Sequence, residues 1–132
     1  MTFASRITRL PIPVDPARGQ SALALTGISD PPLADLIRGA AGSSPYLAGL
    51  IGHEAAWLAD SLLQPGSATL DMVARETEGF GALGADALGP ALRRAKRRVA
   101  LWTALCDLGG VWTLEQVTGA LTDLADRATD LA

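Results

Sequence analysis

The sequence predicts an all-α protein, a small bundle of about five to six helices with an irregular N-terminal arm. Two observations support this class. Apolar residues make up 48% of the 132 residues and aromatic residues only 5%, so that alanine and leucine supply most of the apolar content. Both favour helices, whereas the β-branched and aromatic residues that favour strands are scarce. Apolar side chains also recur at steps of three and four, which is the spacing of one helix face.

Size and charge narrow the classes of protein further. The chain is long enough for one domain with a real core. Its 11 basic and 14 acidic residues give a net charge of -3, so overall charge offers no case for nucleic-acid binding. A single cysteine excludes an internal disulfide and fits the reducing cytoplasm, where we expect the protein. No apolar run approaches the roughly 18–20 residues of a membrane span.

The first 29 residues show the weakest helical periodicity in the sequence. Three prolines and two glycines punctuate them, and no helical period is sustained. We expect residues 1–29 to form an extended arm lying on the domain, with at most a helical turn from Ser21 to Leu25. The helical domain is expected over residues 30–132.

Two helices should begin with the same start signal. Asp30 precedes Pro31, and Ser44 precedes Pro45. The side chain of Asp or Ser accepts from the free N–H groups of the first turn, and proline suits the first helical position. The first helix should end near Gly42, and its apolar stripe consists of Leu33, Leu36, Ile37 and Ala40.

The middle of the chain predicts three shorter segments. The helix that starts at Ser44 should break at Gly52-His53, and a further segment should carry Trp57, Leu58 and Leu62. Pro65-Gly66 should stop that segment, because these residues do not continue a helix. Another helix is expected from about Thr69 to Phe80.

A long helix should begin near Asp86. It should end at Gly109-Gly110, since glycine adopts the left-handed conformation of a helix C-terminus. Steps of three and four give it a heptad-like seam that fits packing along a neighbouring helix. The seam consists of Leu88, Leu92, Ala95, Val99, Trp102 and Cys106.

The last helix opens on Thr113-Leu-Glu-Gln116, in which the Thr hydroxyl and the Gln amide each satisfy a backbone N–H of the other residue. Its apolar positions are Leu114, Val117, Leu121, Leu124, Ala128 and Leu131. Asp126 and Asp130 place negative charge where the helix dipole disfavours it at a true C-terminus. We therefore expect the helix to continue in a longer chain, of which this sequence is a truncated fragment.

The densest charge cluster lies on the long helix and is the candidate functional site. Its residues are Arg93, Arg94, Lys96, Arg97 and Arg98. Like charges four residues apart repel by roughly a few tenths of a kcal/mol, so a negative partner is expected. Three interpretations stay open: a solvated face or one paired within the chain by Glu76, Glu78, Asp123 and Asp126, a contact with an acidic surface of another domain or protein, and a nucleic-acid or phosphate site. The last is disfavoured, because no aromatic stacking platform accompanies the cluster.

No pattern in the sequence predicts a catalytic, cofactor or metal site. His53 is the only histidine and lacks neighbours at ligand spacing, so we expect a surface histidine. Cys106 lies on the apolar seam and is expected to be buried. Gly79 to Gly84 spell the G-x-G-x-x-G of a dinucleotide loop, but the residues before them predict helix rather than strand, which favours a connection between helices.

Residues 92–126 resemble the N-terminal region of bacterial glutamine synthetase adenylyltransferase. The matching features are the basic block Leu92-Arg-Arg-x-Lys-Arg-Arg98, then Leu101, Leu105 and Asp107-Leu-x-Gly110, then Leu114-x-x-Val-Thr-x-x-Leu-x-x-Leu-Ala-Asp126. Ser44-Pro-Tyr-Leu-Ala48 and Trp57-Leu58 also resemble that family. The resemblance covers roughly residues 44–130.

The resemblance implies a function for the parent protein. The family's full chain holds two nucleotidyltransferase-type domains, one attaching AMP from ATP to glutamine synthetase and one removing it. Both use Mg²⁺ held by a Gly-Ser-Asp-x-Asp type motif, which this sequence lacks. We therefore expect an inactive scaffold without cofactors of its own, whose basic block contacts the downstream nucleotidyltransferase domain. Implied partners of the parent are glutamine synthetase and the PII signalling protein.

Two further expectations concern association. A free-standing helical interaction module, with no enzyme attached, is the alternative to the scaffold. If part of the apolar surface is normally covered by another domain, the chain should self-associate through its last two helices.

Overall fold

A computed structural model describes residues 2–64 and 71–131. These residues form eight α-helices and one 3-10 helix, and they contain no strand. The predicted all-α class is confirmed, and the number of helices lies above the predicted five to six. In chain order the elements are α1 (Phe3–Arg6), α2 (Pro16–Thr26), α3 (Pro31–Ser43), α4 (Pro45–His53), α5 (Ala55–Leu63), α6 (Met72–Glu76), η1 (Phe80–Ala82), α7 (Ala85–Leu108) and α8 (Leu114–Leu131).

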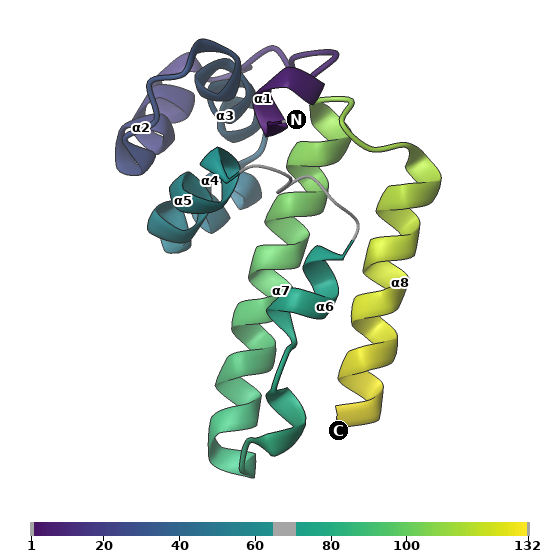
Figure 1. Ribbon diagram of the computed structural model, residues 1–132. Coiled ribbons are helices and arrows are strands. Elements are labelled where there is room, and N and C mark those ends of the chain that lie inside the picture. Colours follow the sequence, from purple (N-terminus) through teal and green to yellow (C-terminus); the bar gives the residue numbers. More distant parts are fainter. Residues whose placement is uncertain (1, 65–70, 132) are drawn as a thin grey trace.

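The long helix α7 is the axis of the molecule. Helices α1 to α5 gather at its C-terminal end, α8 runs back alongside it, and α6 lies against both α7 and α8 (Figure 1). None of the helices in the described ranges is long and apolar enough to cross a membrane.

The predicted irregular arm is wrong for two parts of residues 1–29. Helix α1 is capped by Thr2, whose hydroxyl accepts from the Ser5 N–H at 3.2 Å. Helix α2 begins at Asp15-Pro16, the same start signal as Asp30-Pro31, and it ends at Gly27 in the left-handed conformation. The prolines nearby suggested a broken segment, but Pro16 occupies the first helical position, where proline stabilises a helix.

Between α1 and α2 the chain is extended and lies across α3. Gly39 of α3 makes this possible, because a side chain there would collide with the backbone oxygen of Pro11. Arg18 fixes the far end of the segment, with its Nε donating to the Ala41 carbonyl and its Nη2 to the Gly42 carbonyl, each at 2.8 Å. The N-terminal segment is thus part of the packed structure.

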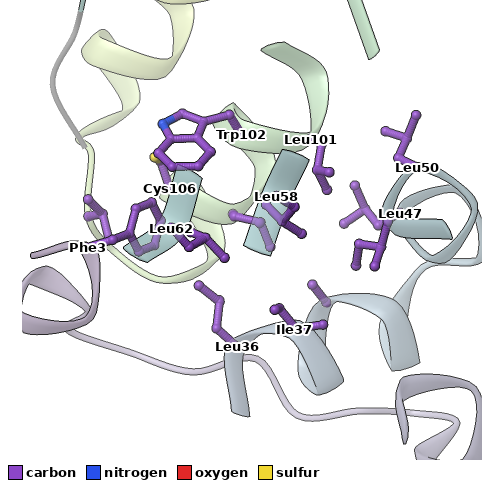
Figure 2. Packing of buried hydrophobic residues seen from close by; sticks show 14 of the residues in the cluster. Phe3, Leu36, Ile37, Leu47, Leu50, Leu58, Leu62, Leu101, Trp102 and Cys106 are labelled. Carbon is purple, nitrogen blue, oxygen red and sulfur yellow. The ribbon is translucent and has the colours of Figure 1, made fainter. Parts of the chain in front are cut away.

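The core lies where α3, α4, α5 and α7 meet (Figure 2). Trp102 of α7 stands at its centre, with only 1% of its surface exposed. Phe3 and Trp57 meet its ring edge to face, at centroid distances of 5.1 and 5.8 Å. The buried leucines and isoleucine around these rings are Leu36, Ile37, Leu47, Leu50, Leu58, Leu62 and Leu101.

Cys106 is buried in the same core, as the apolar seam predicted. Its burial raises the pKa of the thiol far above its usual range, and the positive charge of Arg6 lowers it by less. The thiol therefore behaves as a small apolar group.

The turn between α7 and α8 follows its predicted signals. Gly110 has a φ of 65°, and the Val111 N–H donates to the Cys106 carbonyl at 2.8 Å. The Thr113 N–H donates to Gln116 Oε1 at 2.8 Å, and the Gln116 N–H donates to Thr113 Oγ1 at 3.2 Å. The capping box is confirmed.

Two expectations in the middle of the chain have different outcomes. The break near Gly52-His53 is confirmed, because α4 ends at His53 and α5 begins at Ala55. The helix expected over Thr69–Phe80 is shorter: it covers Met72–Glu76, and a turn then leads to η1. Its first two residues and the stop at Pro65-Gly66 lie outside the described residues.

We expect Gly39→Ala to destabilise the protein by about 1–3 kcal/mol, because the added methyl group forces α3 away from the Pro11 backbone. Gly49→Ala is the matched control, since Gly49 is exposed on α4 and a methyl group there meets nothing. Chemical denaturation of both variants measures the difference. A Gly39→Ala protein as stable as the Gly49→Ala protein would contradict the close packing.

We expect the Cys106 thiol to react slowly with an aromatic disulfide reagent at pH 8, because only an accessible thiolate attacks the reagent. The reaction should be at least about 100-fold slower in the native protein than in the protein unfolded by guanidinium. Absorbance of the released thiol gives both rates. Comparable rates would show that the thiol is open to solvent.

Candidate functional site: the basic segment of α7

The five basic residues of α7 fall into two groups. Arg97 and Arg98 turn toward the α4–α5 junction and α6, where carboxylates meet them. Arg93, Arg94 and Lys96 are exposed, and no carboxylate in the described parts of the chain forms an ion pair with them. The intramolecular interpretation thus holds for two residues of the predicted site.

The carboxylate of Glu54 is the main partner of the first group. Glu54 joins α4 to α5, and its side chain is only 6% exposed. Its Oε1 lies 3.5 Å from Arg97 Nη2, and its Oε2 lies 3.4 Å from Arg98 Nε. A carboxylate buried without a cation beside it would destabilise the fold by roughly several kcal/mol, and the two guanidinium groups offset that cost for Glu54.

Glu76 of α6 completes the network from the other side. Its Oε2 lies 3.3 Å from Arg98 Nη1, and its Oε1 accepts from the Trp57 indole N–H at 3.2 Å. The Arg98 guanidinium also lies over the Trp57 ring, 5.1 Å from the centroid. An arginine over an aromatic face gains about 0.5–2 kcal/mol. Arg98 therefore connects α7 with both α5 and α6.

The geometry of this ion-pair network suits the positioning of α7 rather than the catalysis of a reaction. Glu54 Oε1 and Arg97 Nε are buried without a hydrogen bond in the described structure, so the Arg97 contact is held by charge. Both carboxylates face arginines, which stay protonated and cannot exchange a proton at neutral pH. The network fixes the direction in which α7 leaves the cluster of α1 to α5.

The sequence identified one partner and missed another. Of the four acidic residues named as partners, Glu76 is confirmed for Arg98, whereas Asp123 pairs with Arg127 on its own helix at 3.0 Å. Glu78 and Asp126 form no ion pair with the basic segment within the described residues. Glu54 was not among the predicted partners, yet it stands four residues from both Leu50 and Leu58, which are buried. That spacing was the available signal that Glu54 lies on the buried face.

The other candidate positions carry no cluster of functional groups. His53 is exposed at the end of α4. The G-x-G-x-x-G segment lies between α6 and α7 and follows a helix, as expected. Over residues 2–64 and 71–131, no three His, Cys, Asp or Glu side chains come together as metal ligands.

A hollow lies between α5, α6 and α7. Trp102 borders it, and the Trp102 indole N–H is buried without an acceptor among the described residues. Among the described residues that line this hollow, Glu76 is the only acidic one, and it already binds Arg98 and Trp57. The residues that line it are Trp57, Ser61, Gln64, Met72, Arg75, Glu76 and Trp102.

Comparison with known proteins identifies the family. A sequence model of glutamate-ammonia ligase adenylyltransferase matches residues 34–132. A bifunctional glutamine synthetase adenylyltransferase/adenylyl-removing enzyme of Rhodopseudomonas palustris strain TIE-1 is 39% identical over 113 residues, which cover 84% of this chain and 11% of that protein. No solved structure matches the chain.

Relatives from other bacteria carry the same name. The protein of Bradyrhizobium sp. strain ORS 278 is 43% identical over 100 residues, covering 74% of this chain and 10% of its own length. That of Caulobacter vibrioides is 41% identical over 91 residues, covering 68% of this chain and 9% of its own length. The chain thus spans about a tenth of the length of the curated relatives it matches. Because the family match covers three quarters of the chain, this protein belongs to the glutamate-ammonia ligase adenylyltransferase family.

Proposed function

We propose that this chain is a helical scaffold of an enzyme that adds AMP to glutamine synthetase and removes it again. The observation that carries the proposal is the family match over residues 34–132, together with the shared name of the relatives. In this proposal the enzyme works in the cytoplasm, and its partners are glutamine synthetase and the PII signalling protein.

The chain's own part is to present a surface in a fixed position. Glu54 and Glu76 hold Arg97 and Arg98, so α7 is anchored along its middle. Arg93, Arg94 and Lys96 project from this anchored helix with their charge unpaired within the described residues. An acidic surface of the nucleotidyltransferase domain is the partner that this charge fits, because opposite charges steer and align two surfaces.

Catalysis is assigned to other parts of the enzyme. Nucleotidyl transfer relies on Mg²⁺ to neutralise phosphate charge, and the ion needs several carboxylates at one point. The described residues bring no such group together, and the sequence contains no Gly-Ser-Asp-x-Asp motif. ATP and Mg²⁺ are therefore assigned to a catalytic domain, and the purified chain alone should neither add nor remove AMP.

The proposal is tested by exchanging the matched region of the Rhodopseudomonas palustris enzyme for this chain. We expect the chimera to keep adenylyl removal from glutamine synthetase, because the scaffold is equivalent. Replacing Arg93, Arg94 and Lys96 together by Glu should lower that activity at least about tenfold, since like charges then meet at the contact. Mass spectrometry of glutamine synthetase follows the loss of AMP.

The control chimera carries Arg127→Glu, a charge reversal on α8 outside the basic segment. Its activity should stay within about twofold, because Arg127 pairs with Asp123 on the same helix at a half-exposed site, where an ion pair contributes little. A chimera that folds but has no activity would contradict the scaffold and favour a free-standing interaction module. Full activity in the triple Glu chimera would contradict the role of the basic residues.

A further inference from the structure

The pair of helices α7 and α8 has one covered side and one open side. Helix α6 contacts both helices (Figure 1). The side chain of Arg98 on α7 turns toward α6, where it pairs with Glu76. Lys96 stands two positions before Arg98, about 200° around the helix, so it projects on nearly the opposite face. The side away from α6 is therefore the side on which Lys96 lies.

Leu114 and Leu121 of α8 lie on the same side as Lys96. In an antiparallel helix pair, equivalent flanking positions of the two heptads face the same side of the seam. Lys96 directly follows the seam residue Ala95, and Leu121 directly follows Ala120, which is buried against α7. Leu114 stands seven residues before Leu121, one heptad earlier.

The apolar stripe of α8 is only half covered. Of its 18 residues, Ala120 and Leu124 alone are buried among those described. Leu121 is 44% exposed and Leu114 is 73% exposed. Amphipathic helices place leucines in one stripe in order to bury them, so a stripe with two exposed leucines fits a second packing partner.

Charge identifies the chemistry of that partner. Lys96 and its neighbour Arg93 border the open side and are exposed, without an ion pair in the described residues. Their counterparts on the covered side, Arg97 and Arg98, have carboxylates within 3.5 Å. The open side thus combines leucines with cations that lack a carboxylate.

We propose that the open side of the α7–α8 pair binds an acidic amphipathic helix. Its apolar stripe covers Leu114 and Leu121, and its carboxylates pair with Arg93 and Lys96. The inference rests on the proposed function, in which this helix belongs to the remainder of the enzyme, about nine tenths of the relatives' length. A second copy of the chain fits less well, because the α8 part of its open side offers only leucine, threonine and alanine to Lys96. Asp107 of α7 lies on the same face as Lys96, but it already pairs with Arg9.

The test uses the whole chain and a synthetic peptide of about three heptads, with leucine at the seam positions and glutamate elsewhere. The reference peptide carries lysine in place of every glutamate. We expect the glutamate peptide to bind and to shift the amide signals of α7 and α8. Leu121→Asp, and Arg93→Glu combined with Lys96→Glu, should each weaken binding at least about tenfold at low salt.

Matched controls test whether binding depends on this surface or on any exposed leucine or basic residue. Leu25→Asp changes an exposed leucine of α2, and Arg75→Glu changes an exposed arginine of α6, on the covered side of the helix pair. Both should leave the affinity within about twofold, since neither residue lies on the open side. Leu114→Asp replaces Leu121→Asp if circular dichroism shows that the latter is unfolded.

Four results would overturn the inference: no binding of the glutamate peptide, equal binding of the lysine peptide, amide shifts outside α7 and α8, or a dimer whose contact already covers Leu114 and Leu121. The experiment contains no glutamine synthetase. An active chimera without peptide binding would therefore contradict only the proposed acidic helix. Peptide binding together with an inactive chimera would contradict only the proposed function.

Discussion

The buried carboxylate of Glu54 is the constraint on which the rest of the structure depends. It lies at the junction of α4 and α5, where a charge is tolerated only beside cations, and Arg97 and Arg98 of α7 supply them. Arg98 then extends to Glu76 and over the Trp57 ring, so α5, α6 and α7 are joined at one point. Apolar packing around Trp102 brings the same helices together.

This constraint divides the basic segment into two functional parts. Arg97 and Arg98 are used inside the molecule, and they keep α7 in place for the residues beside them. Arg93, Arg94 and Lys96 remain outside, on the same helix. In the proposed enzyme the first group holds α7 rigidly in place, and the second group contacts the acidic surface of the nucleotidyltransferase domain. The exposed leucines of α8 extend the contact surface on one side, so charge and apolar area act together there.

The sequence predicted the features that depend on local chemistry. Asp30, Ser44 and the Thr113–Gln116 capping box begin helices as expected, since a helix start is decided by neighbouring residues. Features that depend on distant residues were missed. Asp15-Pro16 begins a helix although prolines surround it, and Glu54 is buried because arginines more than 40 residues away meet it. The half-covered stripe of α8 could not be predicted either, because periodicity shows which face is apolar but not how many neighbours cover it.

The coupling between Glu54 and Arg98 is the most direct measurement of this arrangement. A double-mutant cycle would combine Glu54→Gln with Arg98→Met and measure the free energy of unfolding of each protein. We predict a coupling energy of at least about 1.5 kcal/mol, because the pair is largely removed from water. The half-exposed pair Asp123–Arg127 provides the reference cycle, with Asp123→Asn and Arg127→Met and an expected coupling of at most about 0.5 kcal/mol. Additive effects at Glu54 and Arg98, or coupling no larger than in the reference cycle, would contradict the role of Glu54 as the constraint that positions α7.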